Sequence, residues 1–280
     1  MGRRTSSRGV QKSKNVKNAS NLQVSKPEGI FTSQPFKFVV GEAKTEFLLH
    51  SALVASKSEA LGRLINGGFV EGQQGFVVLE DEDAKTVAAF AEFIYTGDYQ
   101  LSFDFPAQSD SELEDPSHEV WPHPENEYLL EFLDGKADHG ADYEISSEPE
   151  DDPAARPLII GSMTADYSEF FIAHAKVFIF ADYYGVVELM NLSIDRLYNA
   201  LRVFRLSSER IGDILALVRF CYERPSPNRL KKLVLSYSAA IIDPDVSESV
   251  AQSFQELWKE RGDFAADMAW LLACRLMADT

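Results

Sequence analysis

Short stretches of alternating hydrophobic and polar residues mark the first third of the chain. In the clearest of them, three apolar residues lie two positions apart, as in a strand with one buried face: Phe36, Phe38 and Val40. Two further short apolar runs follow at 46–50 and 76–79. Gly41 lies directly after the first run, where a tight turn leads into the second. The pattern predicts a small sheet of three short strands.

A second pattern, with apolar residues every three or four positions, predicts helices. A short apolar helix is expected at 53–56, and a longer one has the stripe Val87, Phe90, Ala91 and Ile94. Gly97 follows this stripe, at the position where a left-handed residue ends a helix. The same spacing recurs further on, in the stripe Met190, Ile194, Leu197 and Leu201. We expect these stripes to be core faces.

Four more amphipathic helices are predicted after Leu201. Their apolar stripes begin, in chain order, at Ile211, Leu230, Val250 and Phe264. Ser207 is a candidate N-cap for the first helix, and Pro227 is expected at the first position of the second, after Ser226. These helices are expected to pack on one another as a helical extension over 202–280.

The order of these elements resembles the BTB/POZ domain. The likeness rests on Phe36-Lys-Phe-Val-Val40, Glu46-Phe-Leu-Leu-His50, Asn66-Gly-Gly-Phe69, Phe76-Val-Val-Leu79 and Tyr95-Thr-Gly97, and resumes at His174-Ala-Lys-Val177 and Ala181-Asp-Tyr-Tyr-Gly185. It is closest to the fungal-type BTB proteins that have extra helices after the domain. The resemblance implies an α+β fold, with a short mixed sheet flanked by a helical cluster, and a BTB/POZ domain over 31–201.

The net charge of −17 is concentrated in one segment. Between Asp104 and Asp152 there are seventeen acidic residues and one basic residue, Lys136, so this segment alone has a net charge of −16. Repulsion between like charges, together with several prolines, opposes the formation of a packed core. We therefore expect a disordered acidic insertion that interrupts the domain at about 103–165.

The insertion also contains two small apolar clusters, Val120-Trp121 and 128–133. Acidic sequence with interspersed aromatic and leucine residues is typical of linear docking motifs. Two interpretations remain open, because the segment could equally be a solvated spacer without a partner. In either case, deletion of residues 104–152 is expected to leave the fold intact.

The N-terminal segment has the opposite charge. Residues 1–26 include seven basic residues and no acidic one, among many serines, asparagines and glycines. Such composition predicts a disordered basic arm, which we place at 1–30. A nuclear import signal, a weak intramolecular or nucleic-acid contact and a solubilising tail are the three interpretations of it.

No combination of residues predicts catalysis. His50, at the end of a predicted strand, and His174, on an apolar helix, are interpreted as structural residues. Three more histidines lie in the acidic insertion without the rigid spacing of a tight metal site: His118, His123 and His139. The chain contains neither a phosphate-binding loop nor a Gly-x-Ser-x-Gly nucleophile motif. We therefore predict a non-enzymatic protein without catalytic residues, cofactor or metal.

The sequence also indicates a compartment. No apolar run approaches the about eighteen residues that a membrane-spanning helix needs, and no signal segment opens the chain. The two cysteines, Cys221 and Cys274, lie on apolar helix patterns and are expected to be buried thiols in a reducing compartment. An intracellular protein, cytoplasmic or nuclear and without membrane contact, is predicted.

The BTB likeness implies a function in protein binding, for which two hypotheses remain. In the first, the chain is an adaptor that links a partner to a cullin-type ubiquitin ligase. The resemblance implies that the cullin would meet the loop after Tyr95-Thr-Gly97 and the helices at 170–197, and the acidic insertion interrupts this loop. We expect four exposed residues to bind the partner there: Tyr99, Leu101, Tyr167 and Phe170.

In the second hypothesis the chain is a self-associating nuclear scaffold or transcription-associated factor without a ligase role. BTB homodimers often use a strand-exchanged N-terminus and a charged pocket, and Pro35 and Ser51 stand where the family has an acidic and a basic residue. The loss of both charges weighs against the pocket-dependent mode. Nucleic-acid binding by the folded part is not expected, because the sequence has no zinc-ligand pairs and the domain body is not basic.

Overall fold

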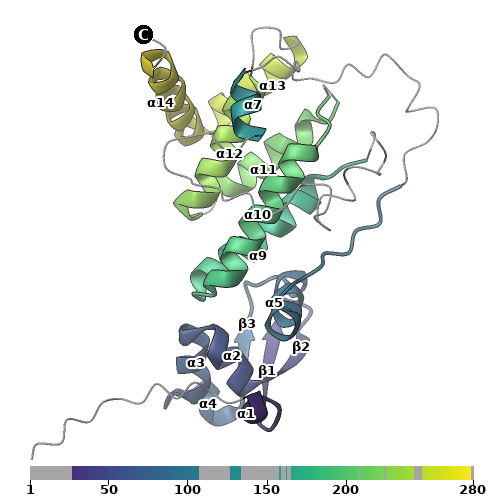
Figure 1. Ribbon diagram of the computed structural model, residues 1–280, viewed down its shortest axis with the longest axis vertical. Coiled ribbons are helices and arrows are strands. Elements are labelled where there is room, and N and C mark those ends of the chain that lie inside the picture. The colour runs from purple at the N-terminus through teal and green to yellow at the C-terminus, as the bar shows by residue number, and fades with distance from the viewer. Residues whose placement is uncertain are drawn as a thin grey trace, which may run out of the picture.

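The computed structural model describes residues 27–106, 127–133, 158, 162, 165–207, 209–223, 225–242 and 248–278. Within them the chain is α+β, mostly helical, with one small mixed sheet, which confirms the predicted fold class at this level. The sheet and helices α1 (Pro27–Phe31) to α5 (Ala84–Thr96) occupy one end of an elongated molecule, and the later helices stack beyond them (Figure 1).

The sheet consists of three strands, β1 (Pro35–Val40), β2 (Thr45–His50) and β3 (Phe76–Leu79). Their order is β2-β1-β3, and β1 pairs antiparallel with β2 and parallel with β3. Gly41, with a φ of 66°, begins the β1–β2 turn, as the sequence predicts. The alternating residues Phe36, Phe38 and Val40 are all buried on one face of the sheet. The three predicted strands are therefore present.

Five helices accompany the sheet: α1, α2 (Ser51–Lys57), α3 (Glu59–Asn66), α4 (Val70–Gln74) and α5. The Ser58 side chain caps α3 and the Asp83 side chain caps α5, each by accepting a backbone N–H of the first turn. Gly97 ends α5 in the left-handed conformation, as predicted. Sequence patterns missed α1, α3 and α4. Because α1 begins at Pro27, the prediction of a disordered arm over 1–30 is wrong for its last residues, and residues 1–26 lie outside the described chain.

The rest of the described chain is helical. Its elements are α7 (Glu127–Leu133), α9 (Ser168–Tyr183), α10 (Val187–Val203), α11 (Ile211–Glu223), α12 (Asn228–Ile241), α13 (Glu248–Glu260) and α14 (Gly262–Ala278). The four helices predicted after Leu201 are all present, as α11 to α14. Pro227, which we expected at the first helical position of α12, is its N-cap residue instead.

Helix α9 joins two hydrophobic cores. One core lies beneath the sheet and includes Phe38 and Phe90, which face the same interior. The other lies among helices α7 and α10 to α14. Phe180 of α9 belongs to the first core and Phe170 to the second, so α9 contributes buried residues to both cores. This double burial explains why α9 is apolar around most of its circumference.

The acidic insertion is not disordered throughout, contrary to the prediction. Helix α7, in its middle, packs between α10 and α12, and the fully buried Phe132 places its ring 5.2 Å from those of Tyr198 and Tyr237. The Tyr198 hydroxyl donates a 2.6 Å hydrogen bond to the Phe132 carbonyl. The cluster at 128–133 therefore serves the chain's own core, because its aromatic and leucine residues repeat at helical spacing. The cluster Val120-Trp121 lies outside the described residues.

The base of the insertion is also packed. The Ser162 backbone N–H donates a 2.8 Å hydrogen bond to the Pro106 carbonyl, which joins the two ends of the insertion. The Phe105 ring lies 4.2 Å from that of Tyr167. The boundaries predicted at about 103 and 165 therefore fall inside ordered structure.

Candidate functional site

The four residues predicted to bind a partner do not form an exposed surface. Tyr99, Tyr167 and Phe170 are buried, and Leu101 is half-buried against the core beneath the sheet. The expectation that they are exposed is therefore wrong. Their position explains the error, since they flank the insertion where its ends leave and rejoin the domain. Large aromatic residues there close the two cores instead of facing solvent.

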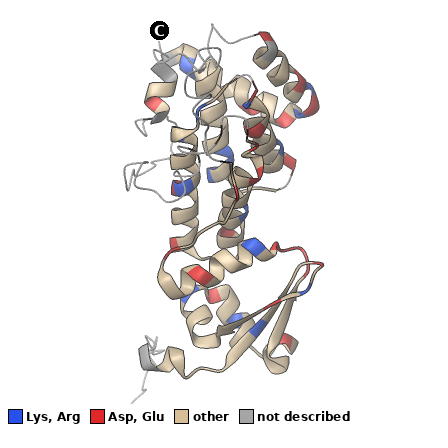
Figure 2. Cartoon of the chain, turned by 90° about the vertical axis from the view of Figure 1, so that its right-hand side faces the viewer, with Lys and Arg blue, Asp and Glu red and all other residues tan. Residues whose placement is uncertain are grey.

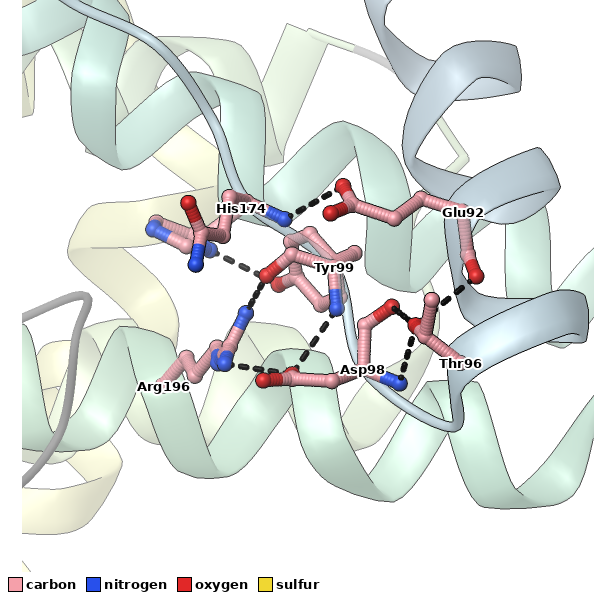
Figure 3. Close-up of polar contacts among 7 residues, drawn as sticks. Glu92, Thr96, Asp98, Tyr99, His174 and Arg196 are labelled. Carbon is pink, nitrogen blue, oxygen red and sulfur yellow. Dashed lines mark hydrogen bonds and ion pairs between the residues drawn. The ribbon is translucent and has the colours of Figure 1, made fainter.

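Tyr99 belongs to a polar network that fastens the end of α5 to helices α9 and α10 (Figure 3). The Arg196 guanidinium donates hydrogen bonds to the Tyr99 carbonyl and, at 2.5 Å, to the Asp98 carboxylate. It also lies 4.5 Å from the centre of the Tyr99 ring, in a cation–π contact. We call Asp98, Tyr99, His174 and Arg196 the junction network.

His174 is the titratable centre of this network. Its Nδ1 atom lies 2.8 Å from the Tyr99 hydroxyl, and its buried Nε2 atom has no hydrogen-bond partner. Burial, with a smaller effect of the Arg196 charge, lowers the pKa of His174 to about 3. The imidazole is therefore neutral near pH 7 and enclosed, which supports its interpretation as a structural residue.

His50 also has a structural position. It ends β2 and is the N-cap residue of α2, and its Nδ1 atom lies 2.8 Å from the Tyr95 hydroxyl. The same hydroxyl accepts the His50 backbone N–H at 3.2 Å. The pair connects the sheet to α5, as expected for a residue at a strand-to-helix junction.

A second buried polar cluster holds the return of the insertion, and sequence reasoning missed it. The Tyr167 backbone N–H donates to the Asp213 carboxylate at 3.2 Å. The Arg210 guanidinium lies over the rings of Tyr167 and Phe204, at 4.8 and 4.1 Å from their centres. Burial, above all, raises the pKa of Asp213 to about 7, and the adjacent Asp166 contributes to this rise. The only sequence signal is a charged pair at the start of α11, Arg210 just before the helix and Asp213 in its first turn.

Two of the exposed apolar residues lie beside the turn between α9 and α10. Tyr183, with 75% of its surface exposed, and Val187, with 60%, flank the turn between α9 and α10. The Ser58 hydroxyl donates to the Tyr184 carbonyl at 2.6 Å, and Lys57 pairs with Glu188, so this turn is held against helices α2 and α3. Sequence reasoning missed both residues, because helical periodicity does not show which side of a turn faces solvent. We call Tyr183 and Val187 the turn surface.

The described residues contain no group of three or more His, Cys, Asp or Glu residues placed to hold a metal ion. The buried Cys221 has its pKa raised to about 12 by burial, so its thiol is a poor nucleophile near pH 7. Cys274 is half-buried. None of the described helices is long and apolar enough to cross a membrane.

No protein-family model matches this chain, and no curated protein is similar enough to match it. Its function is therefore inferred from its own residues and their arrangement.

Proposed function

We propose that the chain is a non-enzymatic protein-interaction module of the BTB type, and that it links a partner protein to a cullin-type ubiquitin ligase. The order of elements supports the first part. A β1–β2 hairpin, helix α2, strand β3 and helix α5 follow one another in the order that the resemblance implies, with α3 and α4 as additional helices between α2 and β3, and α9 and α10 continue the series.

The observation that carries the adaptor proposal is the turn surface. The resemblance assigns the partner face to the loop after Gly97 and the helices at 170–197, and the described part of these elements exposes two large apolar side chains, Tyr183 and Val187. Exposed aromatic residues that bury on binding contribute much of the energy of an interface. Lys57 and Glu188 lie beside them and provide a polar rim.

Proximity labelling in cells tests this proposal. The full chain is fused to a labelling enzyme and compared with the double variant Tyr183→Ala, Val187→Ser. The proposal predicts labelling of cullin and proteasome components by the native chain and a loss of this labelling in the double variant. A matched control is Trp270→Ala, since Trp270 is 71% exposed but lies on α14, at the end of the molecule away from the sheet. Labelling of chromatin components without labelling of a cullin would contradict the adaptor role.

One observation favours the second hypothesis, a self-associating scaffold. The outer face of the sheet, opposite the core, has three exposed apolar residues, Leu48, Phe76 and Val78. In the strand register, Lys37 lies between Leu48 and Phe76. An exposed apolar sheet face is suited to packing against a second copy. Sedimentation of the native chain and of Val78→Lys would then show a dimer that the substitution dissociates, whereas a native monomer would contradict self-association.

A further inference from the structure

A cleft of about 580 Å³ lies between one end of the sheet and the helices α9 and α11. One wall consists of the β1–β2 turn and the loop between β3 and α5, and contributes five carboxylates: Glu42, Glu80, Asp81, Glu82 and Asp83. Figure 2 shows these acidic loops at the end of the sheet that faces the helical part of the molecule. We call this hollow the acidic cleft.

The opposite wall has different chemistry. It is formed by Ile179 of α9, Phe220 of α11 and Pro225, all at least partly exposed, and by one basic residue, Lys176. The cleft therefore combines a carboxylate wall with an apolar wall. Its volume is within the range of sites that bind small ligands or a few side chains.

The carboxylates are largely unneutralised. Within the described residues, the side chains of Glu42, Glu80 and Asp81 accept no hydrogen bond and form no ion pair. Asp83 is occupied, because it caps α5. Burial, followed by the charges of Asp81 and Asp83, raises the pKa of Glu82, although a hydrogen bond from Tyr184 opposes the rise. A cationic ligand would relieve this repulsion.

The spacing of the charges decides what kind of cation fits. The carboxylates are distributed over two loops, and in the described chain no three acidic, histidine or cysteine residues converge as metal ligands. A single metal ion would therefore leave most of the wall unpaired. Nucleic acid has the wrong charge for this surface. A peptide with several cationic side chains distributes its charge along the wall, and an apolar side chain between them would contact Ile179 and Phe220.

We propose that the acidic cleft is a docking site for a basic peptide segment of a partner protein, in which lysine or arginine residues flank an apolar residue. The inference is independent of the adaptor role, because the cleft and the turn surface share no residue. The affinity for this peptide should fall as the salt concentration rises, since most of the carboxylates are exposed.

The test is a fluorescence-anisotropy titration of the full chain with a labelled peptide of lysine, leucine and glycine residues. The same peptide with glutamate in place of lysine is the probe control. The cleft variant Glu42→Gln, Glu80→Gln, Asp81→Asn should weaken binding at least about tenfold, as expected for several lost charge pairs. Because the chain is strongly acidic, a second variant controls for net charge. It removes three exposed carboxylates that do not line the cleft, by Glu209→Gln, Glu248→Gln and Glu256→Gln, and should change affinity less than about twofold.

Lys176→Gln should change the peptide affinity in the opposite direction. Removal of the one basic residue that lines the cleft should tighten binding. Equal weakening by the two triple variants would overturn the proposal, because the peptide would then be attracted by net charge alone. Peptide binding that requires deletion of residues 1–26 would also overturn it, since the chain's own basic segment would then be the occupant. Thermal melts of all variants confirm that these surface substitutions leave the fold intact.

Discussion

Phe132 offers the sharpest test of how the acidic insertion contributes to the fold. If the insertion were a solvated spacer, shortening it would stabilise the protein by about 1 to 2 kcal/mol, because loop-closure entropy changes slowly with length. The structure predicts that loss of the insertion destabilises the protein instead, because Phe132 is fully buried between Tyr198 and Tyr237. Truncation of a buried phenylalanine to alanine costs about 3 to 5 kcal/mol, through lost burial and the cavity that remains.

That loss is large beside the stability of a domain, about 5 to 15 kcal/mol. For a chain of this size it corresponds to a fall in melting temperature of about 6 to 20 °C. We therefore expect Phe132→Ala to melt well below the native chain in thermal and urea unfolding followed by circular dichroism. Leu130→Ala is the matched control, because Leu130 lies on the same helix with about half of its surface exposed, and should change stability by less than about 1 kcal/mol.

The result that refutes this reasoning is equal, small effects of Phe132→Ala and Leu130→Ala. It would mean that α7 does not pack on α10 and α12 in solution. A milder third variant, Tyr198→Phe, removes the hydroxyl that donates to the Phe132 carbonyl and should cost about 1 kcal/mol.

Three further outcomes are expected. Because burial depresses the pKa of His174 to about 3, folding opposes its protonation, so stability should fall as the pH is lowered from about 6.5 toward 3, and His174→Gln should reduce that slope in urea titrations. For Asp213 the pH dependence of stability has the opposite sign, because burial raises its pKa to about 7. Stability should fall as the pH rises from about 4 to 7, and Asp213→Asn should abolish this component. In the core beneath the sheet, Phe90→Ala should cost about 3 to 5 kcal/mol in thermal melts, whereas the exposed Lys85→Ala should cost less than about 1 kcal/mol; comparable tolerance of both would contradict the core assignment.

Local sequence patterns were sufficient to predict much of the fold. The alternation at Phe36, Phe38 and Val40 predicts β1 and its buried face, and Gly97 predicts the end of α5. Both depend only on backbone preference and on burial of one face. Helix α3 was missed because its apolar stripe is short, with Leu61 and Ile65 as its buried residues.

The burial of the predicted binding residues could not be foreseen in the same way. Tyr99 and His174 meet across 75 positions of sequence, and Arg196 covers Tyr99 from a third element. Such contacts depend on how helices pack, which no local pattern specifies. For α7 the difficulty was the net charge of −16 around it, because that charge concealed a seven-residue apolar helix. The exposure of Tyr183 and Val187 likewise follows from packing, since both lie beside a turn whose neighbours come from α2 and α3.

The most direct test of the proposed function is calorimetric titration of the purified full chain with a cullin N-terminal domain. The adaptor proposal predicts saturable binding with a Kd below about 100 μM, a range in which weak but specific complexes are measurable. The double variant Tyr183→Ala, Val187→Ser should weaken this binding at least about tenfold, because exposed anchors each contribute about 2 kcal/mol when they bury. Trp270→Ala should leave it unchanged. The absence of any association at about 100 μM, or equal binding by the native chain and the double variant, would contradict the proposal.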